Sequence, residues 1–322
     1  MTQAPELPPL QMRRNGFDPV EELAQARDGN GVVRVDTPFG PPAYLVCRYE
    51  DVRRVLSDAA RFSSARSPFP GSGEVNEDED EETTLRAGQL IGFDPPEHTR
   101  LRRMLTPEFT VRRMRRLEPR ITEIVQAALD DLEKAGKPAD LVAPRAQADP
   151  SEDMLGMLVR EHGDDLSTDE LIGIAGLLLL AGHETTSNML ALGTLALLRH
   201  PDQLAMIRDD PARIEPAIEE LLRWLTVVQT LPPRTTTTEV EIAGQAIPAG
   251  SLVICSLPAA NRDRALIDDP DTLDIVRGAA GHVAFGHGVH HCLGAPLARM
   301  EMRIALPRPA PALPRPRPGR PG

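Results

Sequence analysis

The stretch that decides the fold of this chain is F-G-H-G-V-H-H-C-L-G, which runs from Phe285 to Gly294. It places Cys292 in a glycine-rich loop, and a helical pattern starts just after it. The N-terminus of a helix carries unpaired N–H groups and a partial positive charge, which favour a thiolate over a thiol. Gly286, Gly288 and Gly294 would let the backbone approach a flat, bulky partner closely, because they have no side chain. The stretch therefore predicts a ligating cysteine.

An isolated cysteine beside a turn is more often a buried structural residue, but here the full pattern F-x-x-G-x-x-x-C-x-G is present. This pattern closely resembles the haem-thiolate loop of the cytochrome P-450 family. The resemblance implies haem b (iron protoporphyrin IX) as cofactor and Cys292 as the axial ligand of the haem iron. It also implies that Phe285, Gly288 and Gly294 belong to the cofactor-binding loop.

The composition excludes several classes of protein. A net charge of −12 over 322 residues argues against a general nucleic-acid or membrane-surface binder. Three cysteines, Cys47, Cys255 and Cys292, are too few and too scattered for a disulfide framework or a CxxC zinc site. The first residues show no secretory signal, and the apolar run 171–182 is too short to span a bilayer. We expect a cytoplasmic protein of the soluble bacterial branch.

The hydrophobic and turn patterns predict a mainly α-helical fold with small β-sheets, as the P-450 resemblance also implies. The expected helices are 97–105, 110–134, 168–199, 218–225 and one that begins at Tyr49. The expected strands are 32–35, 43–47 and strand pairs across 240–257, joined at 243–244 and 248–250. Three parts are expected: an N-terminal arm (1–16), a P-450-like haem domain (17–306) and a disordered Pro/Arg-rich tail (307–322).

The predicted helix 168–199 carries the next chemical signal. Ser167 and Glu170 form a capping box at its start, and its apolar residues on nearly every face predict burial all round. Glu184 in its middle is costly unless it is paired or wet, and the Thr185 hydroxyl can bond a carbonyl one turn back. A satisfied core glutamate beside a kink is one interpretation. The run A-G-H-E-T-T from Ala181 resembles the P-450 oxygen-activation motif, which implies that Thr185 holds oxygen or its water and that Glu184 relays protons.

Glu220 and Arg223 stand three residues apart, on one face of a predicted helix. Surface pairs of this kind are common. The flanking sequence E-E-L-L-R-W and the position before Cys292 resemble the E-x-x-R pair of the P-450 family, which implies a buried structural ion pair. The third member of that ion-pair set has no clear counterpart in this chain, and Arg277 or Arg262 is the candidate substitute.

Four cationic side chains match the P-450 residues that hold the two haem propionates. His98 and Arg102 stand four apart in D-P-P-E-H-T-R-L-R-R, so that both can face one anion. Arg234 in L-P-P-R and His290, two residues before the cysteine, match two further contacts. Each alone would be taken for a solvated charge, but the set of four predicts a propionate site.

The segment between Arg100 and Arg120 is rich in arginine, against the acidic trend of the chain. A solvated helix face is one explanation. The other is a docking surface for an acidic electron carrier, because complementary charge steers association. The resemblance implies a ferredoxin and a ferredoxin reductase as the electron donors, with O2 and a small organic molecule as substrates.

The chain is shorter than P-450 proteins usually are, and the loss falls near 142–151. In the P-450 family, several helices lie at this place, between the helix called D and the long central helix. These helices form the lid and much of the substrate pocket, and the resemblance implies that they are largely missing here. The remaining substrate-facing candidates are Ala181, Val227, Val228 and Leu231.

Three functions follow from these residues. The first is a haem-thiolate monooxygenase that inserts one oxygen atom from O2 into a small organic substrate, in secondary metabolism. The second is a truncated, catalytically impaired relative that acts as a haem-binding or interaction protein. The third is a non-haem zinc site, whose ligands would be His287, His290, His291 and Cys292.

Overall fold

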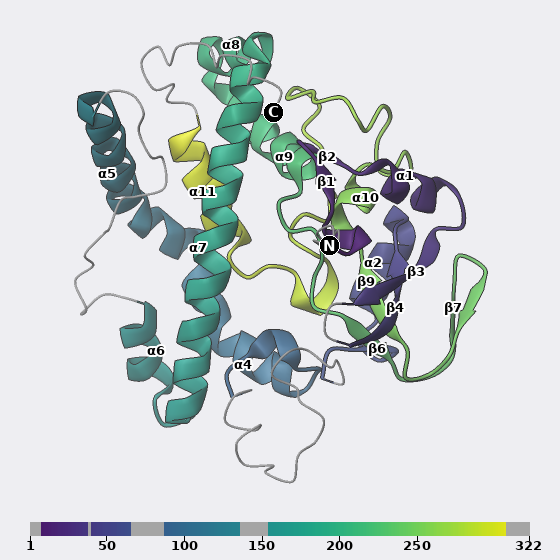
Figure 1. Ribbon diagram of the computed structural model, residues 1–322. Coiled ribbons are helices and arrows are strands. Elements are labelled where there is room, and N and C mark those ends of the chain that lie inside the picture. Colours follow the sequence, from purple (N-terminus) through teal and green to yellow (C-terminus); the bar gives the residue numbers. More distant parts are fainter. Residues whose placement is uncertain (1–7, 38–39, 66–86, 136–153, 307–322) are drawn as a thin grey trace, which may run out of the picture.

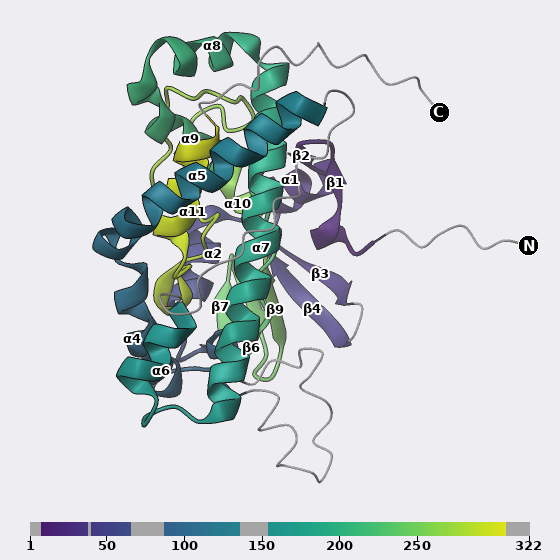
Figure 2. The same ribbon diagram turned by 90° about the vertical axis from the view of Figure 1, so that its left-hand side faces the viewer.

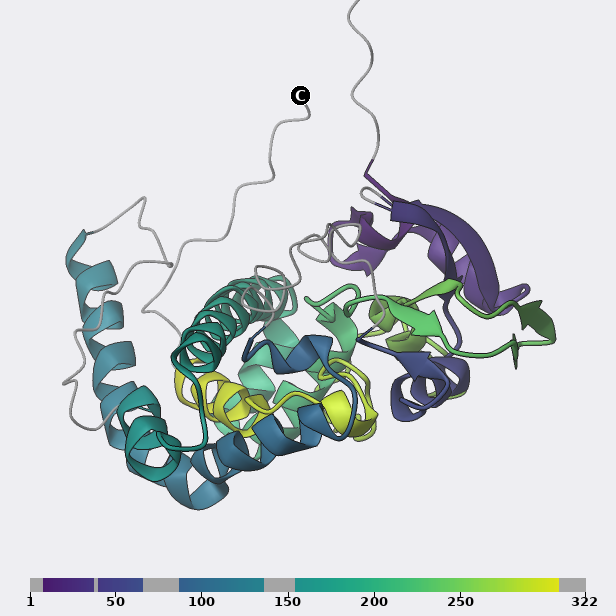
Figure 3. The ribbon, with the colours of Figure 1, turned by 90° about the horizontal axis from the view of Figure 1, so that it is seen from below.

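The computed structural model describes residues 8–37, 40–65, 87–135 and 154–306. A helical part and a smaller sheet part lie beside each other, and the view from below separates them clearly (Figure 1 and Figure 3). The long helix α7 (Thr168–Arg199) runs the length of the helical part. The expectation of a mainly helical fold with small sheets is confirmed.

The helical part contains α4 (Glu97–Leu105), α5 (Val111–Ala135), α6 (Met154–His162), α7, α8 (Pro201–Asp209), α9 (Ile214–Leu225) and α11 (Ala295–Ala305). The side view shows α5 lying across α11 (Figure 2). α4 and α7 have the bounds that the sequence predicts. α9 begins earlier than expected, because Pro216 fits the first turn of a helix, where an N–H group would have no partner.

The start of α7 is fixed by the predicted capping box. The hydroxyl of Ser167 accepts a hydrogen bond from the amide of Glu170 (3.1 Å), and the Glu170 carboxylate accepts one from the amide of Ser167 (2.7 Å). The helix ends at Arg199, and Pro201 opens α8. Proline disfavours helical geometry at the residue before it, so His200 separates the two helices.

The prediction that α7 is buried all round is wrong for its middle. Its C-terminal half packs against α9 and α11, and its N-terminal end packs with α4 and α6. Between these contacts Leu179 and Leu180 are 73% and 66% exposed, and residues 181–184 are exposed as well. The apolar pattern shows which faces of the helix could be buried. Burial itself depends on neighbouring elements, and the described elements cover α7 only toward its two ends.

The sheet part is built on a five-stranded sheet in the order β3-β4-β9-β6-β5. Its strands are β3 (Val32–Thr37), β4 (Gly40–Val46), β5 (Phe62–Ser63), β6 (Arg234–Thr236) and β9 (Leu252–Cys255). The strands pair antiparallel except β4 and β9, which run parallel. Around the sheet lie α1 (Glu21–Asp28), α2 (Tyr49–Ser57), α10 (Leu257–Asn261) and a small pair, β1 (Arg14–Asn15) and β2 (Asp18–Pro19).

The prediction of strand pairs across 240–257 holds for the first pair only. β7 (Val240–Ile242) and β8 (Gln245–Ile247) form a hairpin whose turn residues, Ala243 and Gly244, have positive φ. The next strand, β9, pairs with β4 and β6 instead of β8. All four residues of β9 are buried, so the strand gains more in the centre of the larger sheet than beside an exposed hairpin.

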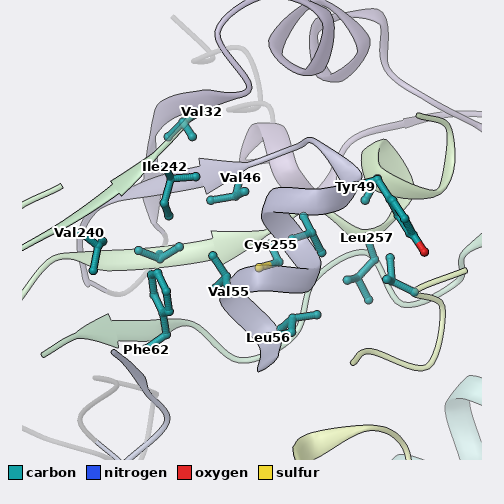
Figure 4. Packing of buried hydrophobic residues seen from close by; sticks show 14 of the residues in the cluster. Val32, Val46, Tyr49, Val55, Leu56, Phe62, Val240, Ile242, Cys255 and Leu257 are labelled. Atoms are coloured by element: carbon teal, nitrogen blue, oxygen red, sulfur yellow. The ribbon is translucent and has the colours of Figure 1, made fainter. Parts of the chain in front are cut away.

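A hydrophobic core joins the sheet to α2 (Figure 4). The apolar residues of α2 recur at helical spacing, at Tyr49, Val52, Val55 and Leu56, and all four are buried. They pack with Phe62 of β5 and with residues of β4 and β9. This core supports the end of α2, against which the cysteine loop rests.

Several predicted features lie outside the described residues. These are the shortened segment near 142–151, the Pro/Arg-rich tail and the first part of the N-terminal arm. Within the described part of the arm, Arg14 donates hydrogen bonds to the carbonyl oxygens of Phe17 (2.8 Å), Thr226 (3.2 Å) and Leu225. Among the described helices, none is long and apolar enough to cross a membrane.

Candidate active site

Cys292 lies just before α11, in the loop that the sequence singles out. Its amide donates a hydrogen bond to the carbonyl oxygen of Phe285 (2.9 Å), and the amide of His291 donates one to the carbonyl oxygen of Gly288 (3.0 Å). These bonds hold the loop in one shape without help from the cysteine side chain. The thiol-bearing side chain of Cys292 is exposed, so that its sulfur is accessible to a cofactor.

The surroundings of Cys292 act on its thiol in opposite directions. Desolvation by nearby protein atoms raises the pKa of Cys292. The N–H groups of Gly294 and Ala295, at the start of α11, lower it, as do the guanidinium groups of Arg102 and Arg299. A metal ion bound to the sulfur would remove the remaining proton outright. The loop therefore suits a metal-bound thiolate.

The glycines of the loop are needed for a reason that the sequence does not reveal. Gly286 and Gly288 both have φ of +70°, which glycine adopts without strain. A Cβ atom at Gly288 would lie 2.4 Å from the carbonyl oxygen of Leu56, at the end of α2. A Cβ atom at Gly294 would meet Cys292 Sγ at 3.9 Å, an ordinary contact. The close approach expected at Gly288 toward a flat partner is thus an approach to α2.

The four predicted cationic residues come together from three segments. His98 and Arg102 lie on α4, Arg234 begins β6 and His290 lies in the cysteine loop. The imidazole rings of His98 and His290 are 4.2 Å apart between centroids, and His98 and Arg234 are 1% and 3% exposed. Arg102 also donates a hydrogen bond to the carbonyl oxygen of His291 (2.7 Å) and so fixes the loop to α4.

This cation cluster has donors that nothing in the described chain satisfies. Both ring nitrogens of His98 and the Nη1 atom of Arg234 are buried and have no hydrogen-bond partner among the described residues. Burial, together with the neighbouring charges of Arg234, His98 and Arg102, lowers the pKa of His290 to about 3. Buried, unpaired donors next to like charges are costly, so the cluster is built to receive an anion.

Sequence reasoning missed the residues that hold His290 in place. The carboxylate of Asp94 accepts hydrogen bonds from the hydroxyl of Ser63 (2.5 Å) and the amide of Ser64 (2.8 Å). The hydroxyl of Ser64 lies 3.2 Å from Nε2 of His290. The only signal in the sequence is the aspartate that opens D-P-P-E-H, and nothing local relates it to serines thirty residues earlier.

Glu220 and Arg223 form a fully buried, two-pronged ion pair on α9, with both N–O distances at 2.8 Å. The remaining donors of Arg223 bind the carbonyl oxygens of Asn261 (3.0 Å), Pro270 (2.6 Å) and Thr272 (3.2 Å). Arg223 therefore anchors the 261–272 segment, which leads toward the cysteine loop.

Neither candidate for a third ion-pair partner reaches Glu220. Arg262 Nη1 lies 3.1 Å from a carboxylate oxygen of Asp271, and Arg277 donates to the carbonyl oxygen of Asp269 (3.0 Å). The remaining hydrogen bond to Glu220 comes from the backbone: the amide of Asp274 donates to Oε1 of Glu220 at 3.0 Å. A backbone donor depends on the path of the chain and leaves no side-chain signature.

The middle of α7 differs from the buried acidic groove that the sequence predicts. Glu184 is exposed, because no described element covers this face of the helix. The Thr185 hydroxyl does bond one turn back, to the carbonyl oxygen of Ala181 (2.6 Å). A second acid was missed: Glu301 of α11 accepts a hydrogen bond from Thr186, and burial raises the pKa of Glu301.

The substrate-facing candidates do not form one surface. Ala181 is exposed on α7, whereas Val227 packs with the core shared by α7, α9 and α11. Val228 and Leu231 pack against the sheet-side core. Of these, Leu231 adjoins the cysteine loop, because its Cδ1 atom lies 3.1 Å from where a Cβ atom of Gly286 would be.

The zinc alternative is not supported. Within the described residues, which include His287, His290, His291 and Cys292, no group of three or more His, Cys, Asp or Glu side chains could hold a metal ion. A single sulfur ligand remains. A haem iron needs only one such protein ligand, because the porphyrin supplies four others.

The site thus has one accessible cysteine at a helix N-terminus, a long helix with an uncovered face, and a buried cation cluster with unpaired donors. The unpaired donors fit the carboxylates of two haem propionates, and the cysteine fits the iron. Fold and site together define a haem-thiolate protein.

Comparison with known proteins names the family. The family model of cytochrome P450 matches residues 145–308. Cytochrome P450 FAS1 of Rhodococcoides fascians is 50% identical over an alignment that covers 93% of this chain and 90% of the relative. The chain belongs to the cytochrome P450 family, whose members are monooxygenases with a haem cofactor.

Solved structures agree with this assignment. OxyB from Actinoplanes teichomyceticus is 41% identical, with a TM-score of 0.78, and the match covers 94% of this chain and 90% of OxyB. P450 StaH from glycopeptide antibiotic biosynthesis is 39% identical, with a TM-score of 0.81 and coverages of 93% and 90%. The alignment with cytochrome P450 FAS1 spans 359 positions, more than the 322 residues of this chain. That relative therefore has internal residues without a counterpart here.

The cation cluster yields a prediction about cofactor retention. Replacing Arg234 with glutamine keeps a polar side chain of similar length but removes the charge, so the haem dissociation constant should rise by about 10- to 100-fold, as for the loss of a charge-assisted hydrogen bond. Titration of the apoprotein with haem measures this. Arg61→Gln, at an exposed arginine paired with Asp58, is the control and should leave the constant unchanged. Equal affinity of Arg234→Gln and the unaltered protein would show that the cluster does not bind the propionates.

Proposed function

We propose that this cytochrome P450 inserts one oxygen atom from O2 into a small organic substrate of secondary metabolism. The observation that carries the proposal is the position of Cys292, which is accessible at the start of α11 beside an anion-binding cluster with unpaired buried donors. Haem, when bound, supplies the binding and reduction of O2. The protein side chains bind the cofactor, handle protons and contact the substrate.

The cation cluster and the cysteine loop bind and orient the cofactor. Cys292 would supply the sulfur ligand of the haem iron, and Phe285, Gly288 and Gly294 shape the loop around it. His98, Arg102, Arg234 and His290 would hold the haem propionates, and the bond from Arg102 to His291 keeps the loop in contact with α4. The buried pair Glu220–Arg223 maintains the scaffold beneath the loop.

Proton handling belongs to the middle of α7. The hydroxyl of Thr185 donates a hydrogen bond to the carbonyl oxygen of Ala181. By rotating, the same hydroxyl can donate to a bound water instead. Glu184 is exposed, which allows it to exchange protons with solvent and pass them to Thr185. Ala181, Val227, Val228 and Leu231 are the proposed substrate contacts, with Leu231 next to the cysteine loop.

The class of substrate is inferred from the relatives. StaH, at 39% identity, comes from the biosynthesis of a glycopeptide antibiotic, which supports a role in secondary metabolism for this chain. The apolar side chains of Leu179 and Leu180, exposed next to Ala181, favour a substrate with an apolar face.

We also propose that an acidic ferredoxin, reduced by its reductase, docks at the start of α5. Within the described chain, Arg100, Arg113 and Arg120 are already paired with acids. The exposed arginines without an acidic partner among the described residues are Arg103, Arg112, Arg115 and Arg116. Phe109, which precedes α5, is 3.9 Å from where a Cβ atom of Gly294 would be, so this surface adjoins the cysteine loop.

The test is reconstitution of the purified protein with haem, followed by reduction with dithionite and exposure to carbon monoxide. We expect the red-shifted Soret band of a thiolate-ligated haem, and O2-dependent product when ferredoxin, reductase and candidate substrates are added. A thiolate band with electrons going only to peroxide would instead support the impaired, haem-binding relative. No haem uptake would overturn both functions.

A further inference from the structure

Next to the cysteine loop lies a cluster of charged side chains, and no role has so far been given to its acid, Glu219. Arg299 of α11 makes two hydrogen bonds to the carboxylate of Glu219 on α9, at 2.6 and 2.8 Å. Nε2 of His282 lies 3.2 Å from the same carboxylate. Three segments that are distant in sequence therefore meet at Glu219, and we call these residues the Glu219–Arg299 cluster.

The cluster is in direct contact with the loop that carries Cys292. The guanidinium carbon of Arg299 is 4.6 Å from the centre of the Phe285 ring, which is the geometry of a cation–π contact. The ring of His282 lies 6.0 Å from the same ring. The carbonyl oxygen of Phe285 in turn accepts the hydrogen bond from the amide of Cys292 (2.9 Å). Phe285 therefore connects the two: its ring contacts the charge of Arg299, and its carbonyl oxygen holds the amide of Cys292.

The two charges of the cluster nearly cancel. Burial favours the neutral acid, but the hydrogen bonds from Arg299 and His282 lower the pKa of Glu219 to about 2. Glu219 is therefore ionised at neutral pH and offsets the positive charge of Arg299. Because both groups are partly shielded from water, removing either one would leave its partner's charge weakly screened.

We propose that Arg299, neutralised and held by Glu219, is a positioning residue that sets the electrostatic potential at the Cys292 sulfur and thereby the reduction potential of the bound iron. This proposal rests on the proposed haem-thiolate function. Reduction adds an electron to the site. An uncompensated positive charge below the loop favours the reduced state, and an uncompensated negative charge disfavours it.

The experiment is a redox titration of the haem-loaded protein and four variants. Glu219→Gln leaves the charge of Arg299 unbalanced, so the midpoint potential should rise. Arg299→Gln leaves Glu219 ionised, so the potential should fall. The double variant carries neither charge and should return close to the potential of the unaltered protein. Arg299→Lys keeps the charge but loses the forked geometry, and it should stay nearer to the unaltered protein than Arg299→Gln does.

A control on the same helix separates this effect from a general loss of charge. Arg303 lies one turn further along α11 and pairs with Glu118 of α5 at 3.0 Å. Arg303→Gln should leave the midpoint potential unchanged.

A purely mechanical role for the cluster would give a different result. All variants would then move the potential in the same direction, or not at all, and the double variant would be the most perturbed; either pattern overturns the proposal. A further readout is the unfolding of the apoprotein by urea. It reports what the Glu219–Arg299 ion pair contributes to stability, and the reduction potential of the iron has no influence on it. If the unaltered protein lacked the thiolate band, the proposed function and this proposal would both fall. A normal band without opposite shifts would overturn the electrostatic role alone.

Discussion

Replacing Cys292 with serine should abolish the thiolate-type carbon monoxide band and the O2-dependent activity together. An alcohol is a far weaker acid than a thiol, so the start of α11 cannot hold a serine as its anion. The accessible sulfur of Cys292 has no substitute within the described residues, because the other two cysteines are buried. The reduced, carbon monoxide-exposed spectrum measures the loss, and haem content per chain shows whether the cation cluster still retains the cofactor.

The matched control is Cys47→Ala. Cys47 follows β4 and is buried in a core that the sheet shares with α1, and burial raises its pKa to about 12, so it remains a protonated thiol at neutral pH. Its removal should lower stability slightly and leave the band intact. A thiolate band that persisted in Cys292→Ser, or disappeared in Cys47→Ala, would contradict the assignment of the axial ligand.

Replacing Arg223 with methionine should cost about 3–5 kcal/mol of the free energy of unfolding, as expected when one partner of a buried ion pair is removed. The change leaves Glu220 as an unpaired charge at a fully buried position. It also removes the donors that bind the carbonyl oxygens of Asn261 and Pro270. Unfolding by urea, followed by circular dichroism, measures the loss.

The control for this prediction uses a pair with the same spacing at the surface. Arg213 and Asp210, just before α9, are also three residues apart and lie 3.2 Å from each other, but their side chains are 38% and 51% exposed. Arg213→Met should therefore change stability by no more than about 0.5 kcal/mol. The double variant Glu220→Met with Arg223→Met should recover part of the loss, because no buried charge remains unpaired. Equal effects of Arg223→Met and Arg213→Met would show that the buried pair is not structural.

Local sequence patterns predicted the elements that carry the chemistry. The loop before α11, the capping box at Ser167 and the bounds of α7 depend on residues a few positions apart, whose hydrogen bonds are satisfied within the same segment. The pair Glu220–Arg223 also lies on one turn of one helix, but its spacing alone fits a surface pair as well, and its burial was expected from the resemblance to the P-450 family. The hydroxyl of Thr185 bonds one turn back, as its spacing predicts.

Other features depend on which distant segments meet. Gly288 is required because a Cβ atom there would collide with the end of α2, more than two hundred residues earlier in the chain. Strand β9 is central because it pairs with both β4 and β6. Asp94 supports His290 only through Ser64. The hydrogen bonds in question join segments that the sequence separates, so no periodicity could reveal them.

By itself, then, the sequence determined a cysteine loop before a helix and a long helix that carries an acid in its middle, because each is a short-range pattern. That these features and four cations serve one haem-thiolate site is what the resemblance to the P-450 family implied. Only the tertiary structure decided how much of α7 is covered, where Glu184 lies and which residues bring charge beneath the cysteine loop. Burial and electrostatic environment are sums over neighbours from the whole chain. They are fixed only when helices α7, α9 and α11 pack around the loop.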